Sequence, residues 1–325
     1  MHSYEELVSY FKEKLLEQKF EKSPDELYKP IQYCLSFGGK RMRPVMTLMA
    51  CELFGESFEK AIPQAIAIEL FHNFTLIHDD IMDKAELRRG KTTVYKKWNS
   101  NIAILAGDTL FALAYQYAIQ AETNLLPEIL SLFNKTAVEV CEGQQFDLNY
   151  ETRNDVSLAE YIKMIRLKTA VLFATSLKIG ALIGSAGETD AQRLYDFGIN
   201  LGLGFQLQDD LLDTFGNEKI FGKKQGGDII TNKKTYLYLY ALQNASAKDK
   251  KRLLELYSQE NGIPENEKIE NVTEIFIRTG VKEAVQNIIN GYLRKGLELL
   301  ESLDVPEQNL KPLVSVADKM IFREK

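Results

Sequence analysis

The chain has 325 residues, of which 45% are apolar and 26% are charged, a composition that excludes a disordered or fibrous protein. Its formal net charge of −6 gives no general attraction to nucleic acid, so we expect any anionic ligand to be held by local cations. The three cysteines, Cys34, Cys51 and Cys141, are widely spaced without a CxxC pair, which argues against a disulfide framework or zinc site and favours the cytoplasm.

The elements, taken in chain order, predict an all-α fold. Apolar residues recur at spacings of three and four in many windows, as from Ile62 to Ile77, and no long alternating strand appears. No proline lies between Pro127 and Pro264, which leaves room for several long helices. Helix breaks are expected at residues 23–24, 37–39, 55–63, 86–93, 124–127, 152–157, 184–190, 215–234 and 261–266.

No linker, short repeat or low-complexity segment divides the chain, so we expect a single domain over residues 1–325. A helical bundle of this size can hold a ligand site between facing helices. The N-terminal segment, residues 1–18, is amphipathic with both signs of charge, unlike a secretory signal. The least charged stretch, Ala170 to Ala186, is interrupted by Lys178 and falls short of the roughly 20 apolar residues that a membrane span needs.

Two aspartate triplets of the form DDxxD stand far apart, at residues 79–83 and 209–213, each inside an apolar stretch. On a helix the first and last aspartates of each triplet share one face, and the middle one lies about 100° around the axis. Two like charges about 4 Å apart repel by roughly 4 kcal/mol at an effective dielectric near 20, so such pairs need a cation. Mg²⁺ fits, because it takes oxygen ligands and bridges carboxylates to phosphates.

A lone DDxxD motif is also compatible with a solvated helix face, or with a first helical turn where the dipole favours acidic residues. Two such motifs with apolar flanks make that interpretation poor. An EF-hand is excluded because neither site has the D-x-D-x-D-G pattern. His78 precedes the first motif, but imidazole is a poor ligand for Mg²⁺, so we expect it to have a structural or hydrogen-bonding role.

Basic clusters occur near both motifs, where a diphosphate site would need them. They are Lys40, Arg41 and Arg43 within GGKRMRP (38–44), Arg88 and Arg89, Lys168, Lys223 and Lys224, and Lys233 and Lys234. Any one cluster alone is more typical of a charged surface patch. Their occurrence together with two aspartate motifs indicates two anion sites, one bridged by metal and one held directly by lysine and arginine.

These segments together resemble the trans-type (head-to-tail) isoprenyl diphosphate synthases of the polyprenyl synthetase family. The matching segments, in family order, are GGKRMRP (38–44), ELFHNFTLIHDDIMDKAELRRG (69–90), LAGDTLFALA (105–114), RLKTA (166–170), GFQLQDDLLDTFG (204–216), GKKQGGD (222–228) and NKKT (232–235). The chain departs from the family at Asn232, where glycine is usual, and at Thr235-Tyr236-Leu237, where T-L-P is common. The resemblance implies an all-α, single-domain bundle around a deep central cavity, of the isoprenoid synthase type, and a homodimer.

The resemblance implies condensation of isopentenyl diphosphate with an allylic diphosphate, which is dimethylallyl, geranyl or farnesyl diphosphate. It implies Mg²⁺, with three ions when substrate is bound, and Asp79, Asp83 and Asp209 as metal ligands. Asp80, Asp210 and Asp213 would support them in catalysis. It places Arg88, Lys168, Lys223 and Lys233 on the allylic diphosphate, with Thr169 and Gln206 beside the reacting end. Lys40, Arg43, His72 and Arg89 would hold isopentenyl diphosphate, which binds without metal.

The chemistry follows from these parts. Metal and cations neutralise the leaving diphosphate so that the allylic C–O bond ionises. The double bond of isopentenyl diphosphate attacks the carbocation, and a proton is lost to the departing diphosphate. No side-chain nucleophile is needed, because the protein orients the substrates, excludes water and stabilises charge.

Product length depends on the residues just before the first triplet. Phe74 and Thr75 lie five and four positions before Asp79, roughly 6–7 Å down the helix axis from the metal site. A growing prenyl tail would meet Phe74 there, with Phe71 a turn deeper, and long-chain members usually carry a small residue at the Phe74 position. An uninterrupted DDxxD with this phenylalanine resembles microbial geranylgeranyl synthases, so we expect a C20 product, with farnesyl (C15) or longer products as alternatives. The other interpretation is that Phe74 is simply a core residue.

Two other functions share part of this pattern. A class I terpene cyclase also uses DDxxD, but it would normally replace the second triplet with an N-D-x-x-S-x-x-x-E type motif and would not need Arg89. A non-catalytic subunit of a heteromeric synthase tends to lose one triplet, and both are intact here. Mg²⁺-dependent incorporation of isopentenyl diphosphate separates these functions.

Overall fold

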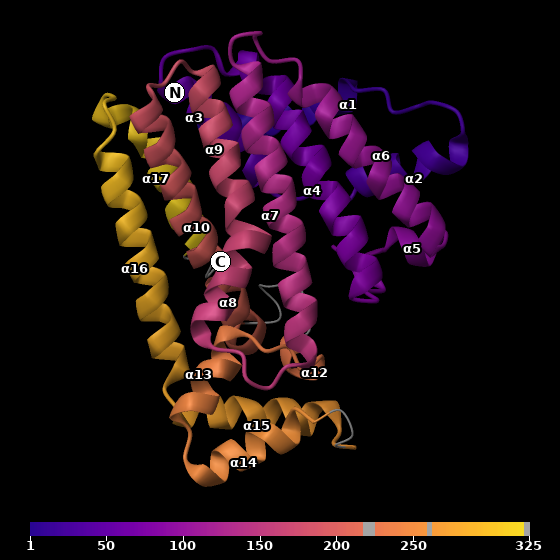
Figure 1. Cartoon of the computed structure of the whole chain (residues 1–325), viewed down its shortest axis with the longest axis vertical. Helices are drawn as coiled ribbons and strands as arrows, with labels where there is room; N and C mark the ends of the chain where they lie inside the picture. Colours follow the sequence, from indigo (N-terminus) through magenta and orange to yellow (C-terminus); the bar gives the residue numbers. More distant parts are fainter. Residues whose placement is uncertain (217–224, 259–261, 322–325) are drawn as a thin grey trace. The chain divides into compact units, whose positions relative to one another are not determined.

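The computed structural model describes residues 1–216, 225–258 and 262–321, and most of them are helical, which confirms the predicted all-α class (Figure 1). The helices of the N-terminal half are α1 (Tyr4–Glu17), α2 (Asp25–Leu35), α3 (Met42–Leu53), the 3-10 helix η1 (Phe58–Ala61), α4 (Ile62–Met82), α5 (Val94–Lys97), α6 (Ser100–Ala118) and α7 (Leu126–Thr152). The others are α8 (Leu158–Ile165), the π-helix η2 (Arg166–Ala170), α9 (Val171–Ile183), α10 (Glu188–Phe215), α12 (Gly227–Ile230), α13 (Tyr236–Asn244), α14 (Ala247–Leu256), α15 (Glu265–Arg278), α16 (Val281–Glu301) and α17 (Glu307–Ile321).

Each predicted break before residue 200 overlaps a gap between helices, although the extents differ by several residues in places, as at 23–24 against 18–24 and 124–127 against 119–125. The break at residues 86–93 contains a feature that the sequence did not indicate, an antiparallel hairpin of β1 (Leu87–Arg88) and β2 (Lys91–Thr92). Its strands are too short to carry an alternating pattern, so periodicity could not find them. Among the described residues, no helix is both long and apolar enough to cross a membrane.

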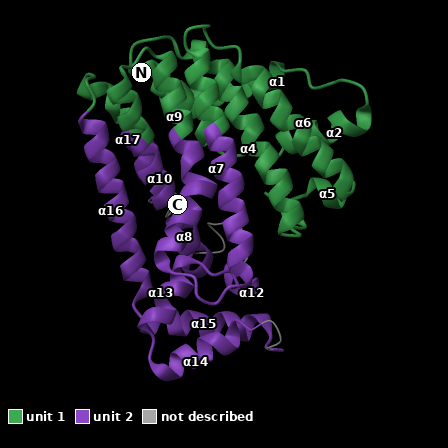
Figure 2. Cartoon of the chain, viewed as in Figure 1, with its two compact units in different colours: residues 1–134, 175–195, 303–313 green, residues 135–174, 196–302, 314–325 purple. Residues whose placement is uncertain are grey.

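The chain forms two compact units (Figure 2). Unit 1 contains residues 1–134, 175–195 and 303–313, and unit 2 contains residues 135–174, 196–302 and 314–325. Helices α7, α9, α10 and α17 contribute residues to both units. The organisation of residues 1–325 as a single domain stays a prediction.

Within unit 1, α4 packs along α6 and α3. On its predicted apolar face, Ile66, Leu70 and Ile77 are at most 1% exposed, whereas Ile62 and Phe74 are half-buried. Each such side chain contributes about 1.5–3 kcal/mol on burial, so this face anchors the helix that carries the first aspartate triplet. Within unit 2, α13 packs against α16, α15 and α8, and η2 packs against α8.

Candidate active site

The first aspartate triplet occupies the end of α4. The helix ends at Met82, Asp83 is its C-cap, and the backbone N–H of Asp83 donates to the carbonyl of Asp79 at 2.8 Å. Asp79 is half-buried and Asp83 is exposed. The C-terminal end of a helix carries a partial negative charge, so two carboxylates there are unfavourable until a cation joins them. These hard oxygen donors at an accessible helix end fit Mg²⁺.

The second triplet lies in the last two turns of α10, which ends at Phe215. Asp209 is half-buried at the start of the triplet. Asp213 accepts a hydrogen bond at 2.9 Å from the backbone N–H of Asp228, at the start of α12, and its own carbonyl accepts from the N–H of Gly226 at 2.8 Å. Asp213 therefore holds the backbone of Gly226 and Asp228 at the start of α12.

The middle aspartate of each triplet is buried and held by protein groups. Asp80 is 2% exposed and accepts from Nε of Arg88 at 2.7 Å. Asp210 is 4% exposed and accepts from the Tyr161 hydroxyl and, at 3.1 Å, from the Gln206 amide. Burial raises the pKa of Asp80 to about 6 and that of Asp210 to about 8. Burial against protein groups is consistent with the supporting role predicted for Asp80 and Asp210, which stays a prediction.

The set proposed for metal binding, Asp79, Asp83 and Asp209, draws on both units. In the described part of the chain, no group of three or more His, Cys, Asp or Glu side chains is arranged to hold a metal ion. The metal prediction therefore rests on the chemistry and placement of the donors and stays a prediction.

The residues predicted for isopentenyl diphosphate gather within unit 1. Nη1 of Arg43 lies 3.3 Å from Nε2 of His72. Burial, with Arg43 next in importance, holds the pKa of His72 well below its usual range, so the ring is neutral and accepts this hydrogen bond. Lys40 is exposed, and the guanidinium of Arg89 donates to the carbonyl of Gly38. Two of the four predicted residues, Lys40 and Arg43, thus belong to the segment 38–43. The other two, His72 and Arg89, contact it.

The predicted Lys168 and Thr169 lie in the π-helical segment η2, a rare conformation that often occurs at functional sites. Nζ of Lys168 forms an ion pair with Asp147 at 2.6 Å, and the hydroxyl of Thr169 donates to Oε1 of Gln206 at 3.0 Å. Thr169 and Gln206 are thus joined to each other, and their place beside the reacting end stays a prediction.

Two glycines allow helices to approach η2 closely. A Cβ on Gly143 of α7 would lie 2.3 Å from the backbone nitrogen of Lys168, and one on Gly202 of α10 would lie 2.5 Å from the η2 backbone. Residues one turn further on are Asp147 and Gln206, the partners of the η2 side chains. Close backbone contact therefore brings the polar side chains within hydrogen-bonding distance.

Sequence reasoning missed Asp147. Burial would raise its pKa, but the ammonium groups of Lys233 and Lys168 hold the pKa below its usual range, so it is an anion between two predicted diphosphate-binding lysines. No motif marks it, because its partners are distant in the chain. Lys223 lies outside the described residues. Lys234 anchors a different segment, donating at 3.3 Å to the side-chain oxygen of Asn154.

The departure at Asn232 has a structural reason. Its φ is +58°, in the left-handed region that glycine and asparagine occupy most readily. Its side-chain oxygen accepts from Nζ of Lys268 at 2.6 Å. Asparagine therefore keeps the backbone conformation available to glycine and adds one hydrogen bond.

The predicted chain-length residues belong to an aromatic cluster in unit 1. The Phe74 ring lies 5.5 Å from Phe71 and 5.1 Å from Phe111, and Phe71 lies 5.5 Å from Phe133. Phe71 is 1% exposed and Phe74 is half-buried. The sequence did not single out Phe111 or Phe133, although Phe111 lies within the matching segment LAGDTLFALA.

Two neighbours of this cluster are held by backbone groups. The Thr75 hydroxyl donates to the carbonyl of His72 at 2.8 Å. Nε2 of His78 lies 3.3 Å from the carbonyl of Ile104, and its ring contacts the edge of Phe74 at 4.8 Å. The expected hydrogen-bonding role of His78 is confirmed.

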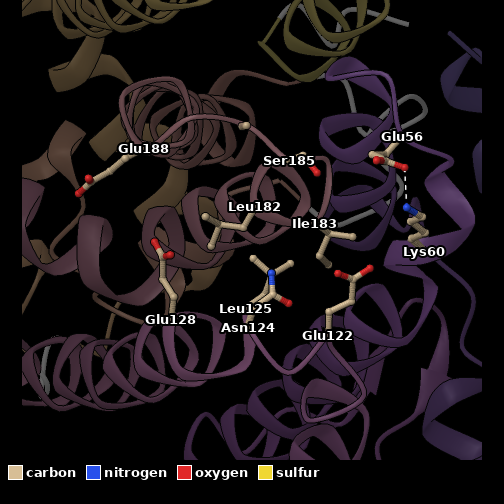
Figure 3. Close-up of a pocket in the computed structure, with 11 residues that line it drawn as sticks. Glu56, Lys60, Glu122, Asn124, Leu125, Glu128, Leu182, Ile183, Ser185 and Glu188 are labelled. Carbon is tan, nitrogen blue, oxygen red and sulfur yellow. Dashed lines mark hydrogen bonds and ion pairs between the residues drawn. The ribbon is translucent and has the colours of Figure 1, made fainter.

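A pocket of about 570 Å³ in unit 1 is a separate feature (Figure 3). Of its 11 lining residues, four are glutamates, Glu56, Glu122, Glu128 and Glu188, and one is a lysine, Lys60, which is paired with Glu56. This surplus of negative charge repels a diphosphate. None of the predicted site residues lines the pocket, so it is not the predicted anion site.

The chain is similar to known proteins over nearly its whole length. The model of the family described as polyprenyl synthetase matches residues 24–276. A geranylgeranyl diphosphate synthase from Methanosarcina mazei is 40% identical over 304 residues, 93% of this chain and 91% of that protein. A geranylgeranyl pyrophosphate synthase from Geoglobus acetivorans is 39% identical over 317 residues, 96% of this chain and 95% of that one. A crystal structure of a geranylgeranyl pyrophosphate synthase matches with a TM-score of 0.95 and 43% identity, covering 100% of both chains.

Proposed function

This chain belongs to the polyprenyl synthetase family and is a prenyltransferase, an isoprenyl diphosphate synthase, and on that premise we propose that it makes geranylgeranyl diphosphate (C20). The substrates are isopentenyl diphosphate and an allylic diphosphate, namely dimethylallyl, geranyl or farnesyl diphosphate. The observation that carries the product length is the contact between Phe74 and Phe111, at 5.1 Å, just before the first aspartate triplet. The names of the relatives support the same product.

Asp79, Asp83 and Asp209 would hold Mg²⁺ for the allylic diphosphate, with Asp80, Asp210 and Asp213 in support. Bound Mg²⁺ would neutralise charge on the leaving diphosphate. Arg88, Lys168, Lys223 and Lys233 add positive charge to the same group. Because Asp80 holds Arg88 at 2.7 Å and Asp147 holds Lys168 at 2.6 Å, these two cations are oriented before substrate binds.

Isopentenyl diphosphate binds without metal, to Lys40, Arg43, His72 and Arg89. Neutral His72 accepts from Arg43 at 3.3 Å and so orients the guanidinium while adding no charge of its own. Arginine matches diphosphate oxygens with its planar fork, and exposed Lys40 supplies a mobile point charge.

Reaction begins with heterolysis of the allylic C–O bond, whose electron pair leaves with the diphosphate. The double bond of isopentenyl diphosphate then forms the new C–C bond to the allylic carbocation, and a proton passes to the released diphosphate. Thr169 and Gln206, joined at 3.0 Å, present their oxygens beside the reacting end and stabilise the positive charge.

The enzyme acts as a cytoplasmic homodimer. Helix α6 and its C-cap expose Ile104, Leu105 and Ile119, at 42%, 58% and 51%, and a second copy would cover this apolar surface. Analytical ultracentrifugation of the wild type and of Leu105→Lys tests the assignment. A dimer that Leu105→Lys leaves intact would place the interface elsewhere.

Product analysis tests the function directly. The enzyme is supplied with isopentenyl diphosphate and, separately, each of the C5, C10 and C15 allylic starters, with and without Mg²⁺. Mg²⁺-dependent accumulation of the C20 diphosphate from all three starters is expected. Products that stop at C15 or continue beyond C20 would change the assigned chain length, and no elongation from any starter would overturn the proposed condensation.

A further inference from the structure

Three basic positions in the 38–44 loop differ sharply in environment. Lys40 is exposed, Arg41 is only 7% exposed, and Arg43 is half-buried beside His72. A charged side chain is costly to bury unless it is paired and hydrogen-bonded. Arg41 therefore has a different task from its two basic neighbours, and it is not a candidate to touch substrate.

The guanidinium of Arg41 joins two other elements. It forms an ion pair with Glu69 of α4, which is 3% exposed, and its Nη2 donates at 2.8 Å to the carbonyl of Leu35, the last residue of α2. Glu69 also accepts from the Asn73 side chain at 2.8 Å. This buried network fixes the loop to α4 and to the end of α2 at once.

The backbone of Arg41 sets the start of α3. Its φ and ψ are 52° and 36°, a left-handed conformation that is unfavourable for a residue with a Cβ, and it is the N-cap of the helix. Arg43 is the second residue of α3. An unfavourable backbone conformation persists only where the surrounding structure stabilises it. For Arg41, the contacts of its guanidinium group provide this stabilisation.

Arg41 and Arg43 both contact α4, one helical turn apart. Arg41 contacts Glu69 and Arg43 contacts His72, and these two partners are three residues apart on α4, on neighbouring positions of one face. The Arg41–Glu69 pair thus sets the register in which Arg43 reaches His72. Arg89, in the turn of the β1–β2 hairpin, donates to the carbonyl of Gly38.

We propose that Arg41 and Glu69 are positioning residues for the isopentenyl diphosphate site, through the loop that carries Lys40 and the first turn of α3 that carries Arg43. This inference rests on the proposed binding of isopentenyl diphosphate at that loop. A shift of the loop weakens binding of this substrate without changing the groups that hold the allylic diphosphate.

Arg41→Lys is the sharpest variant, because lysine retains the charge opposite Glu69 but lacks the fork that also reaches Leu35. The KM for isopentenyl diphosphate is expected to rise at least about tenfold, while the KM for the allylic substrate stays within about twofold. Because a buried pair tolerates removal of both charges better than one, Arg41→Met combined with Glu69→Leu is the second variant, with the same expected pattern. Lys60→Met, at an exposed ion pair of unit 1, is the matched control and should leave both KM values unchanged.

Lys40→Ala distinguishes failure of this inference from failure of the proposed binding site. If Lys40→Ala raises the KM for isopentenyl diphosphate and both Arg41 variants leave it unchanged, positioning by Arg41 is overturned while the site stands. If Lys40→Ala also leaves this KM unchanged, both are overturned. A purely structural Arg41 would lower the melting temperature and the active fraction with both KM values intact, which also overturns the inference.

Discussion

The rings of Phe74 and Phe111 lie 5.1 Å apart with an interplanar angle of 46°, joining α4 to α6 just before the first aspartate triplet. Aromatic pairs in this geometry contribute about 0.5–1.5 kcal/mol of stability in addition to the contribution of their buried area. Displacing either ring therefore costs free energy. A prenyl tail that grows along α4 would meet both rings. The stop to elongation is therefore expected to depend on a residue from each helix.

We expect Phe74→Ala to lengthen the product by at least one isoprene unit, because it removes one ring of the pair. Phe111→Ala should lengthen it too, and the double variant should lengthen it further. Chromatography of the dephosphorylated products measures the distribution. Ile277→Ala, at an exposed position on α15, is the control, and unchanged chain length in both single variants would return Phe74 to an ordinary core role.

Replacing the first aspartate of either triplet by alanine should reduce turnover more than replacing the last aspartate of the second triplet. Asp79→Ala and Asp209→Ala are expected to reduce kcat by about 10²–10³ or more, because each removes a carboxylate that would hold Mg²⁺. Asp213→Ala should reduce kcat less, because the Asp213 carboxylate already accepts a hydrogen bond from the backbone N–H of Asp228 at 2.9 Å. Equal losses in Asp209→Ala and Asp213→Ala, measured by steady-state kinetics, would contradict this asymmetry.

The close approach of α7 to η2 makes Gly143 sensitive to any side chain. Gly143→Ala would place a Cβ 2.3 Å from the backbone nitrogen of Lys168, so it should destabilise the protein and raise the KM for the allylic substrate. The cost is expected to be about 1–3 kcal/mol, as for overpacked cores. Gly291→Ala is the control, because Gly291 lies in α16 with no heavy atom within 4 Å of the new Cβ.

That control should stabilise the protein by about 0.5–1 kcal/mol, because alanine is the better helix former. Thermal and urea denaturation measure both variants. If Gly143→Ala behaves like Gly291→Ala, the helix and η2 are not in the tight contact that orients Lys168.

His72 should make folding stability depend on pH. Its pKa is lowered in the folded state by burial and by Arg43, so below about pH 6.5 the unfolded chain binds a proton that the folded chain does not. Stability therefore falls as the pH drops below that value, by about 1.4 kcal/mol per pH unit from this group, and the effect is absent above it. Urea denaturation without substrate, at several pH values, measures the free energy of unfolding. Its dependence on pH should be weaker in His72→Gln than in the wild type. If the free energies of the two proteins change equally with pH, His72 is not the source of the dependence.

The sequence by itself determined the helical class, the chain positions of most helix ends and the chemical types of the site residues. Helical spacing reports burial directly, and two DDxxD motifs accompanied by basic clusters are specific enough to indicate a metal-bridged diphosphate site. The burial of Ile66, Leu70 and Ile77 on α4 and the separation of Asp80 from Asp79 on the helix surface followed from the 3.6-residue repeat alone.

Only the tertiary structure decided which charges are used internally. Arg41 is next to Lys40 in the chain, yet burial against Glu69 removes it from the set of accessible cations. Asp147 interacts with Lys168 and Lys233, which folding brings close to it. Phe111 is included in the proposed stop to elongation because it packs on Phe74 from another helix. Pattern and spacing describe one element at a time, whereas these assignments arise from contacts between elements far apart in the chain.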